Sequence, residues 1–168
     1  MKSRINYETV APGAIHALLN VEHYVRQSGL EAPLLELVKL RASQINGCAY
    51  CVDMHTKDAR AQGESEQRLY TVAVWNDSPF FTERERAALA WTEAVTRVSE
   101  THVADDVYQS VRQHFNEREL VDLTMAIVAI NGWNRLSISF RKEAGTYQPE
   151  ARHGDAAKPK GVPASSES

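Results

Sequence analysis

Two cysteines and a histidine near residue 50 form the part of the sequence best suited to chemistry. Cys48 and Cys51 are the two cysteines of the chain, and His55 follows the second of them by four residues. On a helix that begins at Cys48 all three side chains share one face, because residues three and four apart are neighbours on a helix. Two thiols beside an imidazole are typical of dithiol–disulfide redox chemistry.

The same residues allow two other interpretations. Cys48, Cys51 and His55 could bind zinc, with Glu36 or a distant histidine as fourth ligand, but the chain lacks the second cysteine pair of a typical zinc module. The cysteines could instead be inert core residues or a structural disulfide, yet a bridge across so short a loop removes little entropy from the unfolded state. Redox chemistry is the preferred interpretation, and it requires neither a metal nor a cofactor.

Glu36 lies on the helix that is predicted before the cysteine pair. Pro33 suits the first turn of that helix, and Gly47 suits the left-handed residue that ends it. Apolar residues wrap around more than one face of the segment, so we expect a deeply buried helix. A carboxylate on such a helix, antiparallel to the cysteine helix, suits a buried proton acceptor. The alternative is a surface ion pair with Lys39, three residues away.

The spacing of Glu36, the two cysteines and His55 resembles the signature of the alkylhydroperoxidase D-like branch of the carboxymuconolactone decarboxylase family. The similarity extends over about 12–141 and includes the runs SQINGC at 43–48 and NGWNR at 131–135. One departure is Tyr50, because some members carry a histidine between the cysteines. The resemblance implies a homo-oligomer that assembles through helical faces.

The resemblance also implies a peroxidase that reduces alkyl hydroperoxides. A thiolate attacks the peroxide, becomes a sulfenic acid and condenses with the second thiol to a disulfide, which a dithiol reductant such as a lipoyl-bearing protein restores. We expect Cys48 to attack, because a helix start is exposed and electropositive. Cys51 would then resolve the intermediate. His55 would relay a proton from Cys51 to Glu36 through water.

Two further activities can be weighed against peroxide reduction. A general dithiol oxidoreductase or redox sensor without peroxide specificity would use the same pair, and it remains the alternative. A thioredoxin fold is disfavoured, because the pair follows a helix and a turn rather than a strand. Lactone decarboxylation, the other activity of the wider family, requires no dithiol.

The hydrophobic pattern predicts helices along most of the chain and shows no sustained strand alternation. Capping boxes are expected at Thr82 with Glu85 and at Asn116 with Glu119. The second of these helices is expected to continue through Asn131 and Asn134. Their side chains suit a contact between helices, which is preferred to a place in the lining of the thiol pocket. We predict an all-α bundle of about six or seven helices, with the cysteine pair at a helix N-terminus. The expected segments are 14–28, 33–45, 48–60, 69–75, 82–98, 103–115 and 116–140.

The length and composition fit one cytoplasmic globular domain. Of the 168 residues, 43% are hydrophobic and 24% charged, and the formal net charge is −3 with no basic block. This charge balance gives no reason to expect a nucleic acid or an anionic membrane as partner, and no apolar run is long enough to span a bilayer. We expect a single helical domain at 1–143. A tail rich in Pro, Gly and Ser at 144–168 should be disordered or dependent on a partner.

Overall fold

The structure is a computed structural model that describes residues 2–149, and it confirms the all-α class. Every predicted segment contains a helix, and two four-residue helices, too short for periodicity to reveal, were not predicted. Along the described residues the elements are α1 (Tyr7–Val10), α2 (Pro12–Arg26), α3 (Ala32–Asn46), α4 (Ala49–Ala61), α5 (Glu66–Thr71), the 3-10 helix η1 (Val72–Asp77), α6 (Glu83–Thr96), α7 (Val98–Thr101), α8 (Asp105–Arg112) and α9 (Glu117–Phe140).

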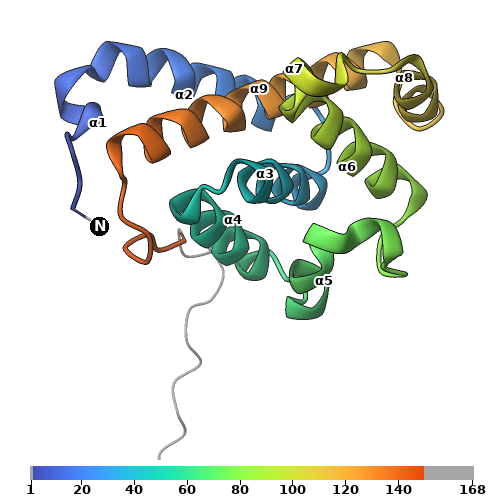
Figure 1. Cartoon of the computed structure of the whole chain (residues 1–168), viewed down its shortest axis with the longest axis horizontal. Coiled ribbons are helices and arrows are strands. Elements are labelled where there is room, and N and C mark those ends of the chain that lie inside the picture. Colours follow the sequence, from blue (N-terminus) through green and yellow to red (C-terminus); the bar gives the residue numbers. More distant parts are fainter. Residues whose placement is uncertain (1, 150–168) are drawn as a thin grey trace, which may run out of the picture.

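Helix α3 lies at the centre of the molecule, between α4 on one side and α6 and α9 on the other (Figure 1). Eight of its fifteen residues are buried, which explains why its sequence is apolar on more than one face. Val38 packs with α6 and α9, Leu40 packs with α5 and η1, and Ala42 packs with both cysteines. The helix that carries Glu36 is therefore held by packing against several neighbouring helices.

The turn between α3 and α4 places the cysteine pair. Gly47 ends α3 with a left-handed φ of 69°, and the N–H of Cys48 donates to the carbonyl of Ser43 at 3.0 Å. Cys48 is the N-cap of α4, and Ala49 is the first helical residue. The predicted position of the pair at a helix N-terminus is confirmed.

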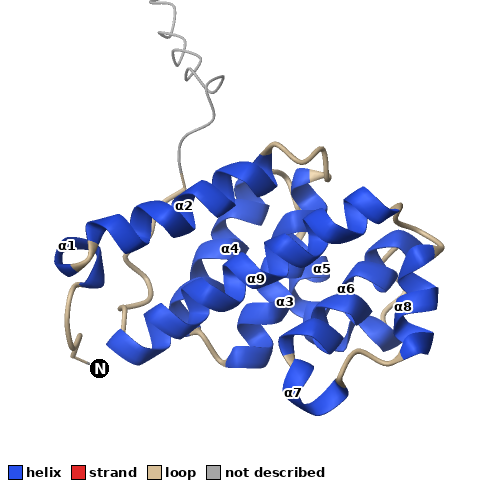
Figure 2. Ribbon diagram, turned by 90° about the horizontal axis from the view of Figure 1, so that it is seen from above, coloured by secondary structure: helices blue, strands red, loops and turns tan. Residues whose placement is uncertain are grey.

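Helix α9 lies beside α2 and runs without a break through Asn131 and Gly132, as predicted (Figure 2). The capping boxes predicted at Thr82 and Asn116 are both present, and they begin α6 and α9. Because α9 is 24 residues long, it contacts both the far end of the bundle and the turn that carries Cys48.

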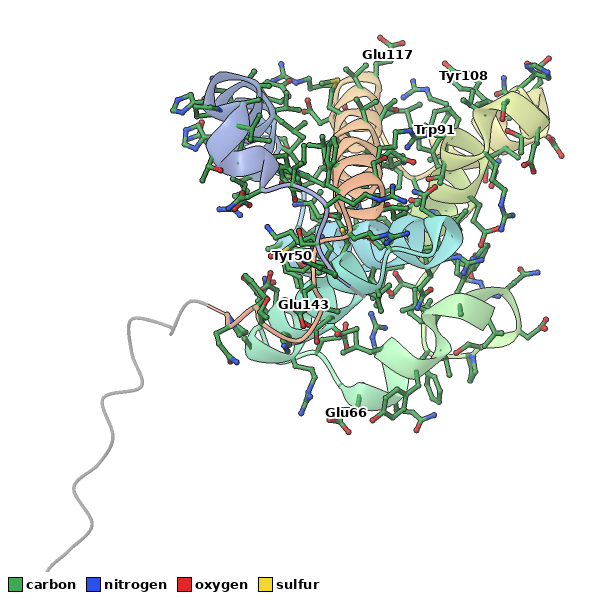
Figure 3. All side chains as sticks on the ribbon, turned by 60° about the vertical axis from the view of Figure 1, so that its left-hand side comes forward. Tyr50, Glu66, Trp91, Tyr108, Glu117 and Glu143 are labelled. Atoms are coloured by element: carbon green, nitrogen blue, oxygen red, sulfur yellow. The ribbon has the colours of Figure 1, made fainter. Side chains whose placement is uncertain are left out.

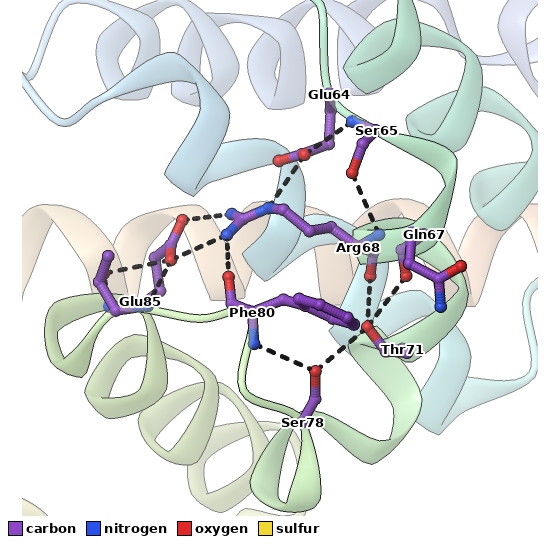
Figure 4. Close-up of polar contacts among 9 residues, drawn as sticks. Glu64, Ser65, Gln67, Arg68, Thr71, Ser78, Phe80 and Glu85 are labelled. Atoms are coloured by element: carbon purple, nitrogen blue, oxygen red, sulfur yellow. Dashed lines mark hydrogen bonds and ion pairs between the residues drawn. The ribbon is translucent and has the colours of Figure 1, made fainter.

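An arginine fixes α5 to the start of α6. Arg68 donates to the carboxylates of Glu64 and Glu85 and to the backbone carbonyl of Phe80 (Figure 4). Its guanidinium also lies over the ring of Phe81, 5.0 Å from the centroid. These contacts hold the outer helices against the core that α3 shares with η1.

The chain turns back towards α4 after α9 ends (Figure 1). The N–H of Gly145 donates to Asp53 at 3.0 Å, and the hydroxyl of Tyr147 donates to Asp58 at 2.7 Å. The first residues of the predicted tail thus contact α4, while 150–168 lie outside the described residues. Between residues 2 and 149, no helix has the length and apolar character needed to cross a membrane.

Replacing Gly47 with alanine should destabilise the fold. At a left-handed φ the added Cβ approaches the carbonyl oxygen, so Gly47→Ala should lower the free energy of unfolding by about 1–2 kcal/mol. The control is Gly13→Ala in the first turn of α2, where nothing lies within 4 Å of the added Cβ, and there the free energy should stay equal or rise slightly. Urea unfolding followed by circular dichroism measures both variants. Equal changes would contradict the role given to Gly47.

Candidate active site

The two cysteines form a close, buried pair. Their Sγ atoms lie 2.7 Å apart, and both thiols are free. Because a disulfide bond is about 2.05 Å long, little movement is needed to form one. Each residue is 1% exposed, so the expectation that Cys48 would be the more exposed of the two is wrong. The turn that carries it is covered by Ile130 and Trp133 of α9.

Cys51 holds its proton more tightly than Cys48 does. The pKa of Cys48 is lowered to about 7, first because the S–H of Cys51 donates to its sulfur and further because of nearby backbone N–H and polar side chains, while burial opposes the shift. The pKa of Cys51 is raised, because its proton is held in the bond to Cys48 and because it is buried. At neutral pH the negative charge therefore lies mainly on the Cys48 sulfur.

His55 and Glu36 meet across the α3–α4 interface. Nδ1 of His55 lies 2.8 Å from Oε2 of Glu36. Burial pushes the pKa of Glu36 upward, but the hydrogen bond with His55 and the charges of His55, Lys39 and Arg26 together outweigh it, so the pKa lies below its ordinary value. An ionised Glu36 accepts Nδ1–H of His55, so Nε2 is the ring nitrogen left to exchange a proton with the site.

The surface pairing considered for Glu36 and Lys39 is wrong. Lys39 is 4% exposed, and its ammonium pairs with Glu22 of α2 at 2.6 Å. A buried lysine was not expected from the sequence, because i,i+3 spacing with a glutamate on a helix usually indicates a solvated pair. Packing of α2 against α3 supplies the other carboxylate, and no local pattern reveals it.

A cavity of about 290 Å³ lies beside α3 and α4 and is lined by polar side chains of both helices. Of the two thiols Cys51 lines it, together with His55 and Glu36. Aromatic side chains form part of the wall, including Tyr50, which is labelled near the start of α4 in Figure 3, and Trp133. A small molecule with an apolar group could therefore approach Cys51 rather than Cys48.

A buried polar network ties the cysteine turn to α9. Asn46 donates to the side-chain oxygens of Asn131 at 3.0 Å and Asn134 at 2.8 Å, and Asn134 donates to the hydroxyl of Ser43 at 3.1 Å. The predicted helix-contact role of Asn131 and Asn134 is confirmed. Asn134 has a second effect, because its side chain lowers the pKa of both Cys48 and Cys51.

Three further residues of the site were not identified from the sequence. The hydroxyl of Ser137 lies 3.8 Å from the Cys51 sulfur, and Asp58 and Tyr147 line the cavity. Asp58 follows His55 by three residues, so helical spacing could have revealed it. Ser137 and Tyr147 reach the site only through the tertiary fold.

Residues 2–149 do not assemble the zinc site considered above. The group of possible metal ligands within those residues comprises Glu36, His55 and Asp58, whose ligand atoms lie within 4.8 Å of one another, and neither thiol belongs to it. The carboxyl of Asp58 already accepts from Tyr147. Burial and the charge of Glu36 raise the pKa of Asp58. The geometry suits proton transfer around His55.

Sequence comparison assigns the family. The model of the carboxymuconolactone decarboxylase family matches residues 12–94. YdfG, an uncharacterized protein of Bacillus subtilis, is 42% identical over 146 residues, which cover 87% of this chain and 99% of YdfG. YnjA, an uncharacterized protein of Escherichia coli, is 32% identical over 68% of this chain and 60% of its own length. The chain belongs to the carboxymuconolactone decarboxylase family, in its alkylhydroperoxidase D-like branch.

Solved structures show the same fold. A protein of unknown function from Agrobacterium tumefaciens, for which a role in antioxidant defence as an AhpD protein has been suggested, is 49% identical. It superposes with a TM-score of 0.84 over 87% of this chain and all of its own. The debrominase Bmp8 superposes with a TM-score of 0.73 at 18% identity, over 80% of this chain and 73% of its own. At that identity the likeness concerns the fold alone.

The shared proton leads to a pH-dependent prediction. The ultraviolet absorbance of thiolate in the reduced protein should rise around pH 7, where Cys48 loses its proton. In Cys51→Ala the sulfur of Cys48 no longer accepts an S–H, so its pKa should return towards the ordinary range and the rise should move to higher pH. An unchanged midpoint in Cys51→Ala would contradict the hydrogen bond as the cause.

Proposed function

We propose that this protein is a thiol peroxidase that reduces alkyl hydroperoxides through a dithiol–disulfide cycle of Cys48 and Cys51. The observation that carries the proposal is a pair of sulfurs 2.7 Å apart, one of which lines a cavity shared with His55 and Glu36. Membership of the alkylhydroperoxidase D-like branch supports it. So does the antioxidant role suggested for the relative from Agrobacterium tumefaciens.

Access to the cavity favours Cys51 as the attacking residue, in place of Cys48 as expected from the sequence. Cys51 must first lose its proton, either to the Cys48 sulfur or to Nε2 of His55, which lines the same cavity. The thiolate then attacks the terminal oxygen of the hydroperoxide. The O–O bond breaks and Cys51 becomes a sulfenic acid. The alkoxide takes the proton that Cys51 gave to Cys48 or His55 and leaves as an alcohol, so Cys48 is a thiolate for the next step.

Cys48 completes the oxidation. Its thiolate attacks the sulfur of the sulfenic acid, the S–O bond breaks, and hydroxide takes a proton to leave as water. The product is an intramolecular disulfide between Cys48 and Cys51. An external dithiol then returns both sulfurs to thiols by exchange and becomes oxidised itself. Because both sulfurs are buried, a dithiol on a long flexible arm, such as a lipoyl group, suits this step better than a bulky protein thiol.

The same burial distinguishes the proposal from a general dithiol oxidoreductase. A disulfide of another protein would have to reach sulfurs that are each 1% exposed. A cavity of about 290 Å³ beside Cys51 admits a small organic oxidant instead. We therefore assign a hydroperoxide as the oxidant.

Loss of the His55–Glu36 pair should slow peroxide reduction without unfolding the protein. Glu36→Gln and His55→Gln should each lower the rate of tert-butyl hydroperoxide consumption on the order of 10²-fold, because proton transfer from Cys51 is impaired. The assay uses excess dithiothreitol as reductant, and circular dichroism reports the helical content.

The control for these variants is Glu66→Gln. Glu66 is exposed on α5, forms an ion pair with Arg60 and is labelled in Figure 3. Glu66→Gln should consume tert-butyl hydroperoxide at the wild-type rate. A wild-type rate in Glu36→Gln would remove Glu36 from the mechanism, and a wild-type protein that consumes no hydroperoxide would refute the proposed function.

A further inference from the structure

A buried ion pair also lines the cavity, and the steps above do not use it. Nζ of Lys39 lies 2.6 Å from Oε2 of Glu22, and the two side chains are only 6% and 11% exposed. Among residues 2–149 this is the most buried ion pair that involves a lysine or arginine. Removing such a pair from water commonly costs as much free energy as its attraction returns, so stability does not explain its position.

The ammonium of Lys39 has hydrogen-bonding capacity left over. It carries three N–H donors, and in the described part of the chain one of them reaches an acceptor, on Glu22. Lys39 lines the cavity together with Cys51. Nε2 of His55, on the same cavity, is also buried without a hydrogen-bond partner among the described residues. Lys39 and His55 therefore both lie at the cavity that Cys51 lines.

The other cations of the cavity are placed differently. Arg26 is exposed, and the ammonium of Lys142 pairs with Glu8 at 2.7 Å with 27% of its side chain exposed. Solvent weakens the field of both. Lys39 is the cavity cation most shielded from solvent, so its charge acts most strongly on a group inside the cavity.

We infer that Lys39 stabilises the negative charge that develops on the leaving oxygen of the hydroperoxide, with Glu22 holding its ammonium in place. The inference rests on the proposed function and names the step that this cation serves. As the Cys51 thiolate attacks the terminal oxygen, the O–O bond breaks and its electron pair passes to the alkoxide. A fixed cation in a site shielded from water lowers the energy of that charge before a proton arrives from His55.

This role predicts which oxidants depend on Lys39. The alkoxide released from an alkyl hydroperoxide is a strong base and needs stabilisation as it leaves. The carboxylate released from a peracid is a weak base and needs little. Lys39 therefore matters most for alkyl hydroperoxides, and its contribution should depend on the leaving group, which no purely structural role would produce.

The test compares two oxidants in two matched variants. Lys39→Met and Glu22→Gln both break the ion pair, but only the first removes the cation. The rate of thiol loss in a single turnover of the reduced protein is measured with tert-butyl hydroperoxide and with peracetic acid. Lys39→Met should react on the order of 10²-fold more slowly with tert-butyl hydroperoxide and at nearly the wild-type rate with peracetic acid. Glu22→Gln keeps the cation but releases it from its partner, so it should lose less rate with tert-butyl hydroperoxide than Lys39→Met does, and it should react with peracetic acid at nearly the wild-type rate.

The inference would be overturned if Lys39→Met lost the same rate with both oxidants. It would also be overturned if Glu22→Gln, which keeps the cation, lost as much rate with tert-butyl hydroperoxide as Lys39→Met does. If Lys39→Met does not fold, the double variant Glu22→Gln/Lys39→Met replaces it, because this variant leaves no unpaired buried charge. It is compared with Glu22→Gln, and the loss of rate should again be confined to tert-butyl hydroperoxide. Failure of the proposed function gives a different result, because the wild type itself would then not react with tert-butyl hydroperoxide. That result would overturn both.

Discussion

The contact between the Cys48 and Cys51 sulfurs, at 2.7 Å, is the interaction on which the account of this site depends. It arises where α3 ends at a left-handed glycine and α4 begins, so that one thiol is the N-cap and the other lies in the first helical turn. The contact lowers the pKa of Cys48 and raises that of Cys51. It also leaves the sulfurs close enough to bond once one of them is oxidised.

The rest of the fold holds this turn in place and shields it from solvent. Helix α3 carries Glu36 and Lys39 on the cavity and is itself buried, and Asn46 at its end is hydrogen-bonded to α9. Polar groups buried in this way are expensive unless they are paired. Here they form the ion pair of Lys39 with Glu22, the hydrogen bond of His55 with Glu36 and an amide network, and the chemistry of the site uses their fixed positions.

Most of the architecture could be predicted from the sequence, because it depends on local signals. The capping boxes at Thr82 and Asn116 and the break at Gly47 correctly marked helix ends. Glu36 and His55 were expected to work together through water, and the structure brings them into direct contact at 2.8 Å. The partner of Lys39 was not expected, because Glu22 lies on α2 and reaches Lys39 only in the folded chain. The exposure of Cys48 was also predicted wrongly. The start of an isolated helix is exposed, but in the folded chain α9 covers the start of α4.

The most direct test of the central claim is a single turnover of the reduced protein with one equivalent of tert-butyl hydroperoxide, followed by mass spectrometry without reduction. The account predicts one tert-butanol per chain and an intramolecular disulfide between Cys48 and Cys51. In Cys48→Ala, a sulfenic acid trapped on Cys51 should replace the disulfide. Intact hydroperoxide beside two free thiols would contradict the account.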